Sequence, residues 1–333
     1  MMKIIVDAFG GDNAPVEILK GCALAVSEYN ASIILTGDEE KIRAAAQENK
    51  ISLDGMEILH APSVMEMEDD PTTILKAKSD TSMAVGLKAL ADGQGDAFVS
   101  AGSTGALTVG ATFIVKRIKG VKRPAIGIAM PTDKGPAFLM DCGANSECRP
   151  EMLHQFAKIG DVYMSSFFGI ERPRVALVNI GTEETKGDEL RLKAYELMKN
   201  EGEYNFIGNM EAREFFLGGC DVAVTDGFTG NVMLKISEGM AKFILSNLKQ
   251  ALTCNLKTKI GALFVKSSVY GLKAKFDYKE YGGAMVVGVK KIVIKAHGSS
   301  DAKAIKNAIH QAIDCVNNDI AGRMQQAFEK EKE

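Results

Sequence analysis

The chain has 333 residues, of which 40 are Lys or Arg and 43 are Asp or Glu, so its formal net charge is −3. Hydrophobic residues make up 46% and charged residues 25%, which is ordinary for a folded globular protein and too apolar for a disordered one. This nearly neutral balance also argues against a nucleic-acid-binding protein that depends on overall positive charge.

Short apolar segments typical of buried strands alternate with segments of helical periodicity along most of the chain. The sequence predicts strands at 3–8, 32–37, 56–61, 96–101, 125–130, 136–141, 174–180, 204–208, 221–226 and 291–297. It predicts helices near 15–29, 38–49, 80–92, 104–118, 150–166, 187–200, 231–252 and 301–328. This alternation indicates the α/β class, with a mostly parallel mixed sheet covered on both faces in a three-layer α/β/α arrangement. No linker or repeat divides residues 1–333, which we expect to form one unit.

The N-terminus and one uncharged stretch bear on where the protein works. The first residues hold too short an apolar run for a signal peptide. Residues 97–115 carry no charge over 19 positions, enough to cross a bilayer, but eight of them are Gly, Ser or Thr. A strand, loop and helix fit this composition better, so we expect a cytoplasmic protein without a transmembrane helix.

Cysteines and histidines give no sign of a disulfide framework or a zinc site. The six cysteines are scattered without a C-x-x-C pair, and the four histidines form no H-E-x-x-H motif. No metal site is predicted.

Loops rich in Gly and hydroxyl residues follow several predicted strands. They read S-A-G-S-T-G-A at 100–106, T-D-G-F-T-G-N at 225–231 and H-G-S-S-D at 297–301, with a looser version at 7–15. Glycines let backbone amides approach an anion, and the following helix N-terminus favours negative charge. One such loop is usually only a tight turn, whereas three in one sheet indicate a phosphate-rich ligand beyond the strand ends. None matches a P-loop or a G-x-G-x-x-G dinucleotide fingerprint.

Other polar residues also lie at predicted strand exits. Cys142, in D-C-G-A-N at 141–145, could be an acyl-accepting nucleophile, but no histidine lies nearby in sequence to activate it, so a buried thiol is the favoured interpretation. The loop at 179–187 carries Glu183 and Lys186 between glycines, which suggests a shaped turn rather than a solvated one. Lys76 and Lys78 could clamp an anion or belong to a solvated helix face.

Taken in order, these loops closely resemble the PlsX family, the acyl-acyl-carrier-protein:phosphate acyltransferases of bacterial phospholipid synthesis. The resemblance runs from I-I-V-D-A-F-G-G-D-N-A-P at 4–15 to the loop at 297–301, and it includes N-I-G-T-E-E-T-K-G at 179–187, F-I-G-N-M-E at 206–211 and Y-G-G-A at 281–284. One departure is Ser103, where the family usually has Asn.

The resemblance implies transfer of a long acyl chain from acyl carrier protein to inorganic phosphate. The acyl phosphate product would serve a membrane acyltransferase that acylates glycerol 3-phosphate. The resemblance also implies an isocitrate/isopropylmalate dehydrogenase-like fold of two intertwined subdomains, a homodimer, and no cofactor.

Phosphate can attack a thioester carbonyl directly, so the protein must bind a dianion and stabilise the charge that develops on the thioester oxygen. We predict His297, Lys186 and Asn231 as catalytic residues, with His297 either protonating the leaving thiolate or serving only as a structural hydrogen-bonding group. The predicted phosphate- and substrate-binding residues are Asp7, Gly10, Gly11, Lys76, Lys78, Ser100, Gly102, Ser103, Thr104, Gly105, Asp141, Asn145, Glu183, Asp226, Gly227, Thr229, Gly230, Gly298 and Ser299.

Residues 239–276 form a basic, apolar segment with seven lysines and no acidic residue. This pattern predicts a helical insertion that docks on anionic lipid, making the protein peripherally membrane-associated. The alternative is that its apolar residues form core or dimer interface. The same basic face could bind the acidic acyl carrier protein.

Two other functions compete with this prediction. A short-chain phosphate acetyl or butyryl transferase using coenzyme A would share the fold, and a non-catalytic scaffold for lipid-synthesis enzymes would share the membrane surface. An isopropylmalate-type dehydrogenase is disfavoured because no cluster of metal-binding Asp residues is evident.

Overall fold

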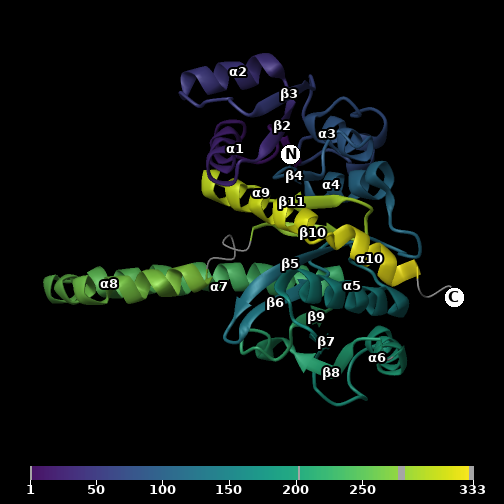
Figure 1. The fold of residues 1–333 in the computed structure, drawn as a ribbon. Coiled ribbons are helices and arrows are strands. Elements are labelled where there is room, and N and C mark those ends of the chain that lie inside the picture. Colours follow the sequence, from purple (N-terminus) through teal and green to yellow (C-terminus); the bar gives the residue numbers. More distant parts are fainter. Residues whose placement is uncertain (1, 202, 277–281, 330–333) are drawn as a thin grey trace.

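The computed structural model describes residues 2–201, 203–276 and 282–329 (Figure 1). Its strands are β1 (Lys3–Asp7), β2 (Ser32–Gly37), β3 (Met56–His60), β4 (Ala97–Ser100), β5 (Ala125–Thr132), β6 (Gly135–Met140), β7 (Arg174–Asn179), β8 (Asn205–Glu211), β9 (Val222–Val224), β10 (Ala284–Val287) and β11 (Ile292–Lys295). They form one sheet in the order β3-β2-β1-β4-β11-β10-β5-β6-β9-β7-β8.

Helices cover both faces of this sheet (Figure 1). They are α1 (Val16–Tyr29), α2 (Glu39–Glu48), α3 (Ser82–Ala91), α4 (Thr104–Gly110), α5 (Pro150–Phe168), α6 (Glu189–Glu201), α7 (Gly227–Thr253), α8 (Leu256–Phe276), α9 (Ala302–Asn317) and α10 (Ile320–Glu329), with the 3₁₀ turns η1 (Pro71–Leu75) and η3 (Ala212–Glu214) and a π-helical turn η2 (Ala111–Lys116).

Successive residues of β1 point into two separate hydrophobic cores. Ile4 and Val6 belong to one core, whereas Ile5 belongs to the other. A strand that is apolar on both faces needs a layer of helices on each side. The predicted α/β fold, with its mostly parallel sheet between helical layers, is therefore confirmed.

The direction of the strands reverses near the middle of the sheet. β2, β1, β4 and β11 run parallel to one another, as do β6, β9 and β7. Between these groups, β10 pairs antiparallel with both β11 and β5, and β5 pairs antiparallel with β6. The chain builds β1 to β4 first, then β5 to β9, and returns beside β4 with β11. The division into two intertwined subdomains stays a prediction.

Several element ends differ from the prediction by a few residues, and the helix predicted at 104–118 is α4 followed by η2. Two further differences concern β10 and the C-terminal helix. β10 was not predicted, because it has only four residues and follows two glycines. The helix predicted at 301–328 is two helices, since Asp319 adopts a left-handed φ of 49° between α9 and α10. The apolar periodicity continues across this break and hides it in the sequence. In the Y-G-G-A motif, Tyr281 lies outside the described residues.

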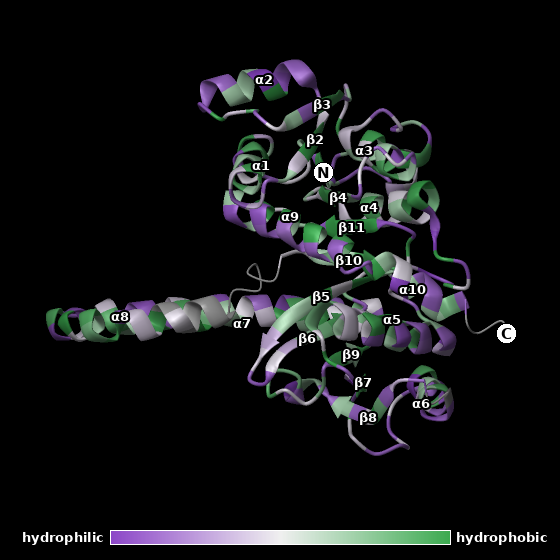
Figure 2. Ribbon diagram, in the orientation of Figure 1, coloured by the Kyte–Doolittle hydropathy of each residue, from purple (hydrophilic) through white to green (hydrophobic). Residues whose placement is uncertain are grey.

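Helices α7 and α8 contact each other and form a hairpin that projects far from the sheet (Figures 1 and 2). The uncharged stretch at 97–115 is a strand, a loop and short helical turns, as predicted. Among the described helices, none combines the length and hydrophobicity needed to cross a bilayer.

Candidate active site

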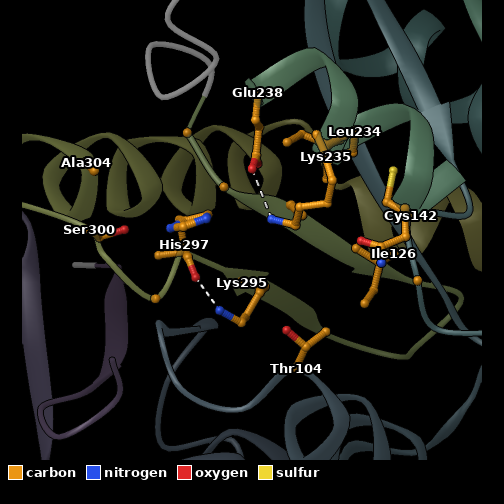
Figure 3. A pocket seen from close by; sticks show the side chains of 18 of the residues that line it. Thr104, Ile126, Cys142, Leu234, Lys235, Glu238, Lys295, His297, Ser300 and Ala304 are labelled. Carbon is orange, nitrogen blue, oxygen red and sulfur yellow. Dashed lines mark hydrogen bonds and ion pairs between the residues drawn. The ribbon is translucent and has the colours of Figure 1, made fainter. Parts of the chain in front are cut away.

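A cavity of about 460 Å³ lies where the two groups of strands meet. Figure 3 shows side chains from both groups converging on it. Its lining comprises Asp12, Met67, Thr104, Ile126, Ile128, Cys142, Gly143, Asn231, Leu234, Lys235, Glu238, Gly282, Gly283, Ala284, Lys295, Ala296, His297, Gly298, Ser300 and Ala304. In open α/β sheets, ligands usually bind in a crevice outside the carboxyl ends of the strands, and Lys295 and His297 lie at and just beyond the carboxyl end of β11.

Lys295 ends β11 inside this cavity. Its Nζ donates to the carbonyl oxygen of Ala101 at 3.2 Å. It also donates to that of Ala296 at 2.5 Å (Figure 3). Burial lowers the pKa of Lys295 to about 8, and the nearby charge of Lys235 acts in the same direction. Asp7 and Asp12 partly offset this shift. The site therefore holds a poorly solvated ammonium group.

α7 brings a second cation and a buried carboxylate to the cavity. Lys235 Nζ lies 3.0 Å from Glu238 Oε2, one helical turn away. The Glu238 side chain is only 8% exposed, whereas that of Lys235 is 54% exposed. Glu238 therefore holds Lys235 at the cavity while leaving its ammonium group accessible to an anion.

The loop from β11 to α9 contributes His297 and Ser300 (Figure 3). The Ser299 amide donates to His297 Nδ1 at 3.2 Å, and Ser299 Oγ lies 2.9 Å from the same nitrogen. Since an amide N–H can only donate, Nδ1 is an acceptor, and a neutral ring carries its proton on Nε2. The Ser300 hydroxyl is buried, and it has no hydrogen-bond partner among the described residues. An unpaired buried hydroxyl in a cavity lining is typical of a ligand site.

The loop at 7–15 and the loop at 100–106 are connected by a hydrogen bond between their side chains. Ser100 Oγ donates to Asp7 Oδ2 at 2.7 Å and accepts from the Gly102 amide at 3.0 Å. A Cβ on Gly10 would lie 2.6 Å from Asp7 Oδ2, so only glycine fits there. Burial raises the pKa of Asp7, against the lowering effect of its hydrogen bonds. The hydrogen bonds between Asp7, Ser100 and Gly102 fix the shape of the two loops. Of the residues in these loops, Asp12 and Thr104 line the cavity.

Gly11 joins the first loop to the third. It adopts a φ of +98°, and a Cβ there would lie 2.8 Å from the Gly298 carbonyl oxygen. The Asp12 amide donates to the same oxygen at 2.8 Å. The loops after β1, β4 and β11 are thus packed together.

Ser103 caps α4. Its Oγ accepts from the Ala106 amide at 3.5 Å. Ser and Asn are both good N-cap residues, so the hydroxyl keeps the capping function that the family's usual Asn would have. Gly105 packs on Pro71 rather than on the cavity.

Asp141 organises the loop after β6. Its carboxylate accepts from four backbone amides, and the Asn145 side-chain amide donates to it at 2.9 Å. A Cβ on Gly230 would lie 1.9 Å from the Asp141 carbonyl oxygen, and one on Gly227 would lie 2.6 Å from that of Asn145. This close packing seats the start of α7 against the loop and brings Asn231 into the cavity lining.

Cys142 lines the cavity as a protonated thiol. Its Sγ donates to the Leu139 carbonyl oxygen at 3.2 Å. Burial raises the pKa of the thiol well above its usual range, and the charge of Asp141 adds to this. Since the thiolate is the reactive form, this geometry favours the buried-thiol interpretation over the nucleophile.

Asp226 caps α7 and is bound by an arginine that the sequence analysis did not single out. Its carboxylate accepts from the Thr229 amide at 2.9 Å and from Arg191 Nη2 at 2.5 Å. Although burial acts to raise it, the pKa of Asp226 is below its ordinary value, because the hydrogen bonds from Thr229 and the charge of Arg191 outweigh desolvation. Neither Asp226 nor Thr229 lines the cavity.

The remaining predicted residues lie away from the cavity lining. Glu183 and Lys186 share a turn at 179–187, closed by the Lys186 amide bond to the Glu183 carbonyl oxygen at 3.1 Å. Lys78 pairs with Asp69, and Lys76 is exposed. The catalytic role of Lys186 and the phosphate-binding roles of Lys76, Lys78 and Glu183 stay predictions.

The cavity thus collects part of the predicted set and adds residues that sequence reasoning missed. His297, Asn231, Thr104 and Gly298 were predicted and line it. The polar and charged lining residues that were missed are Asp12, Lys235, Glu238, Lys295 and Ser300. Asp12 and Ser300 stand within the recognised motifs and could have been chosen, whereas Lys235 and Glu238 look like an ordinary ion pair of a helix surface.

Known proteins resemble this chain over nearly its whole length. The model of a family described as "Fatty acid synthesis protein" matches residues 2–323. A phosphate acyltransferase from Alkaliphilus oremlandii is 47% identical over 96% of this chain and 95% of its own. One from Listeria innocua is also 47% identical, over 99% of this chain and 98% of its own.

Solved structures share the fold at low sequence identity. A phosphotransacetylase from Streptococcus pyogenes superposes with a TM-score of 0.62 at 17% identity, covering 98% of this chain and 94% of its own. A protein assigned as a 4-hydroxythreonine-4-phosphate dehydrogenase from Salmonella typhimurium gives a TM-score of 0.53 at 13% identity, covering 94% of this chain and 99% of its own. The predicted dehydrogenase-like architecture is confirmed.

Proposed function

This chain belongs to the PlsX family of phosphate acyltransferases, and we propose that it transfers a long-chain acyl group from acyl carrier protein to inorganic phosphate. The observation that supports this proposal is a single cavity lined by both cationic and apolar side chains. Lys235, Lys295 and the unpaired Ser300 hydroxyl suit a phosphate dianion. In the same lining, Ile126, Ile128 and Leu234 suit an acyl chain.

In the proposed reaction, a phosphate oxygen attacks the thioester carbonyl carbon directly. The protonated state of Cys142 fits a mechanism without an acyl-enzyme intermediate. The protein then contributes by holding phosphate beside the carbonyl and by stabilising the oxyanion that develops. We assign phosphate binding to Lys235, His297 and Ser300, within the electric field of the Lys295 ammonium group, and orientation of the thioester to Asn231 and Thr104, with the buried loops beneath supporting both sets.

We further propose that the α7–α8 hairpin docks on anionic membrane to deliver the acyl phosphate to a membrane glycerol-3-phosphate acyltransferase. Leu256, Ile260, Leu263 and Phe264 follow helical spacing and are 74%, 51%, 72% and 86% exposed. The surrounding segment holds lysines and no acidic residue. Apolar side chains can enter the lipid while each lysine near an anionic surface contributes about 1 kcal/mol.

We also propose that a second copy of the chain packs against another exposed apolar stripe, which lies along α7. Phe228, Val232, Ile236, Met240 and Phe243 recur at helical spacing and are between 40% and 67% exposed. Such a continuous stripe usually marks an interface rather than a solvated face. A homodimer would bury it against its partner, and size-exclusion chromatography with light scattering measures this directly.

Activity is tested by supplying phosphate with either acyl-acyl carrier protein or acetyl-coenzyme A and trapping acyl phosphate as its hydroxamate. We expect product from the long-chain carrier-protein thioester. Product from acetyl-coenzyme A alone would identify a short-chain transferase instead. Absence of product from both, with intact binding to anionic vesicles, would favour the scaffold.

A further inference from the structure

Lys295 is the cavity cation with the least access to water, and its ammonium group is fixed. It lies beside Ser100 in the register between β11 and β4. Two of its three ammonium hydrogens are donated to the Ala101 and Ala296 carbonyl oxygens. Among the described residues no other acceptor bonds to this nitrogen, which leaves one hydrogen for a ligand in the cavity.

Breaking a thioester bond releases a thiolate that needs a proton. An alkyl thiol has a pKa near 8.5, as in cysteine, so at neutral pH the thiol is the stable product. A positioned acid that protonates sulfur as the bond breaks contributes about 10²- to 10⁴-fold in rate, and it works best when its own pKa lies near the working pH.

We infer that Lys295 is the general acid of the transfer and protonates the leaving sulfur. This inference rests on the proposed function. A phosphate oxygen of HPO₄²⁻ bonds to the carbonyl carbon, and the carbonyl electron pair moves to oxygen. As the oxyanion collapses, the carbon–sulfur electron pair moves to sulfur, which takes a proton from Lys295 Nζ. The neutral amine then takes the remaining phosphate proton of the product, so that the thioester and HPO₄²⁻ yield acyl phosphate dianion and free thiol.

The surroundings of Lys295 suit this role. Lys235 faces it from α7, Asp7 from β1 and Asp12 from the loop after β1. Burial is the main cause that brings its pKa to about 8, which lies close to that of the leaving thiol. The group is therefore charged at neutral pH and still able to release its proton. His297 Nδ1 accepts from the Ser299 amide, so this nitrogen has no proton to give to the leaving sulfur.

The test separates proton donation from charge. Lys295→Arg keeps the positive charge, but its guanidinium does not release a proton. With an alkyl acyl-thioester we expect kcat to fall about 100-fold or more. With an aryl thioester, whose thiolate leaves without protonation, we expect this variant to stay close to wild type. Wild-type kcat for the alkyl thioester should decline as pH rises through about 8, and this decline should vanish with the aryl thioester.

Lys291→Arg, at an exposed position just before the same strand, is the matched control and should change neither rate. Equal losses of Lys295→Arg on both substrates would overturn the inference and leave Lys295 a binding or structural residue. Rescue of His297→Gln by the aryl thioester, without rescue of Lys295→Arg, would assign the acid to His297 instead. If the wild-type protein makes no acyl phosphate from any thioester, the proposed function fails together with this inference. The outcomes that concern Lys295 or His297 alone can be observed only when the wild type is active.

Discussion

Lys235 and Lys295 face one cavity from opposite halves of the sheet, the first from α7 and the second from the end of β11. Both are ammonium groups and only donate hydrogen bonds, and the charge of Lys235 disfavours the charged form of Lys295. A bound dianion would remove this repulsion. The pair would therefore be better stabilised with phosphate bound, as the proposed phosphate site requires.

Removing one of these charges should weaken phosphate binding. We expect Lys235→Met to raise the KM for phosphate by about tenfold or more, because one charge-assisted contact is worth roughly 1.5–3 kcal/mol. The KM for the acyl donor should change far less. Lys50→Met, at an exposed position remote from the cavity, serves as the control in steady-state assays. An unchanged phosphate KM in Lys235→Met would remove this lysine from the phosphate site.

Loss of Arg191 should destabilise the protein and reduce its acid sensitivity. Arg191 and Asp226 are 14% and 9% exposed, so Arg191→Met leaves a largely buried carboxylate unpaired and should cost about 3 kcal/mol in the free energy of unfolding. The pKa of Asp226 is depressed in the folded state. Its stabilising contribution is therefore complete above the unfolded pKa of about 3.9 and is lost as pH falls through the folded value.

Urea unfolding of the two proteins between pH 7 and pH 3 measures both effects. The difference between wild type and Arg191→Met should shrink as the pH falls. Arg213→Met removes an arginine that is 75% exposed and should cost under about 0.5 kcal/mol. A pH-independent difference would show that Arg191 stabilises the fold through packing alone.

Position 230 should not tolerate a side chain. Gly230→Ala places a Cβ 1.9 Å from a backbone oxygen, so α7 and the loop at 141–145 must separate, and we expect a loss of about 3 kcal/mol or more. Gly239→Ala, on the same helix, meets nothing within 4 Å and should stabilise the helix by up to about 1 kcal/mol. Thermal unfolding compares the stability of each variant with that of the wild type. We expect a loss for Gly230→Ala and a gain for Gly239→Ala.

Charge placed on the tip of the hairpin should abolish membrane binding. Leu256→Glu/Leu263→Glu puts two carboxylates where apolar side chains would enter the lipid, so co-sedimentation with anionic liposomes should be lost. Ser246→Glu/Ser267→Glu adds the same charge at other exposed positions of the hairpin and should weaken binding only in a salt-sensitive way. Undiminished binding of the leucine variant to anionic liposomes would contradict the docking proposal.

The cap at Ser103 gives a smaller, local prediction. Ser103→Ala removes the acceptor of the Ala106 amide, and since that bond is long at 3.5 Å we expect a loss of only about 0.5 kcal/mol. Ser103→Asn should restore most of it, because Asn caps equally well. Urea unfolding at neutral pH measures both. A larger loss for Ser103→Asn than for Ser103→Ala would show that the loop has no room for the amide.

The sequence predicted the fold class well because apolar strands and helical periodicity are local signals. Asp301, for example, caps α9, and Asp is among the residues preferred at that position of a helix. The cavity was harder to predict, since it depends on which strand ends meet. Lys295 looks like one alternating residue of a strand, and only the pairing of β11 with β4 reveals that it is enclosed. β10 was hidden by its shortness, although it joins the two halves of the sheet.

The return of the chain to its first half has a consequence for biosynthesis. Lys295 contacts Ala101, which lies 194 residues earlier in the sequence. Until β11 has been made, β4 presents an unpaired edge, and one wall of the cavity does not exist. Catalytic competence therefore arrives among the last events of synthesis. A nascent chain that stops after the hairpin would carry the surface proposed to dock on membrane, without the means to make acyl phosphate.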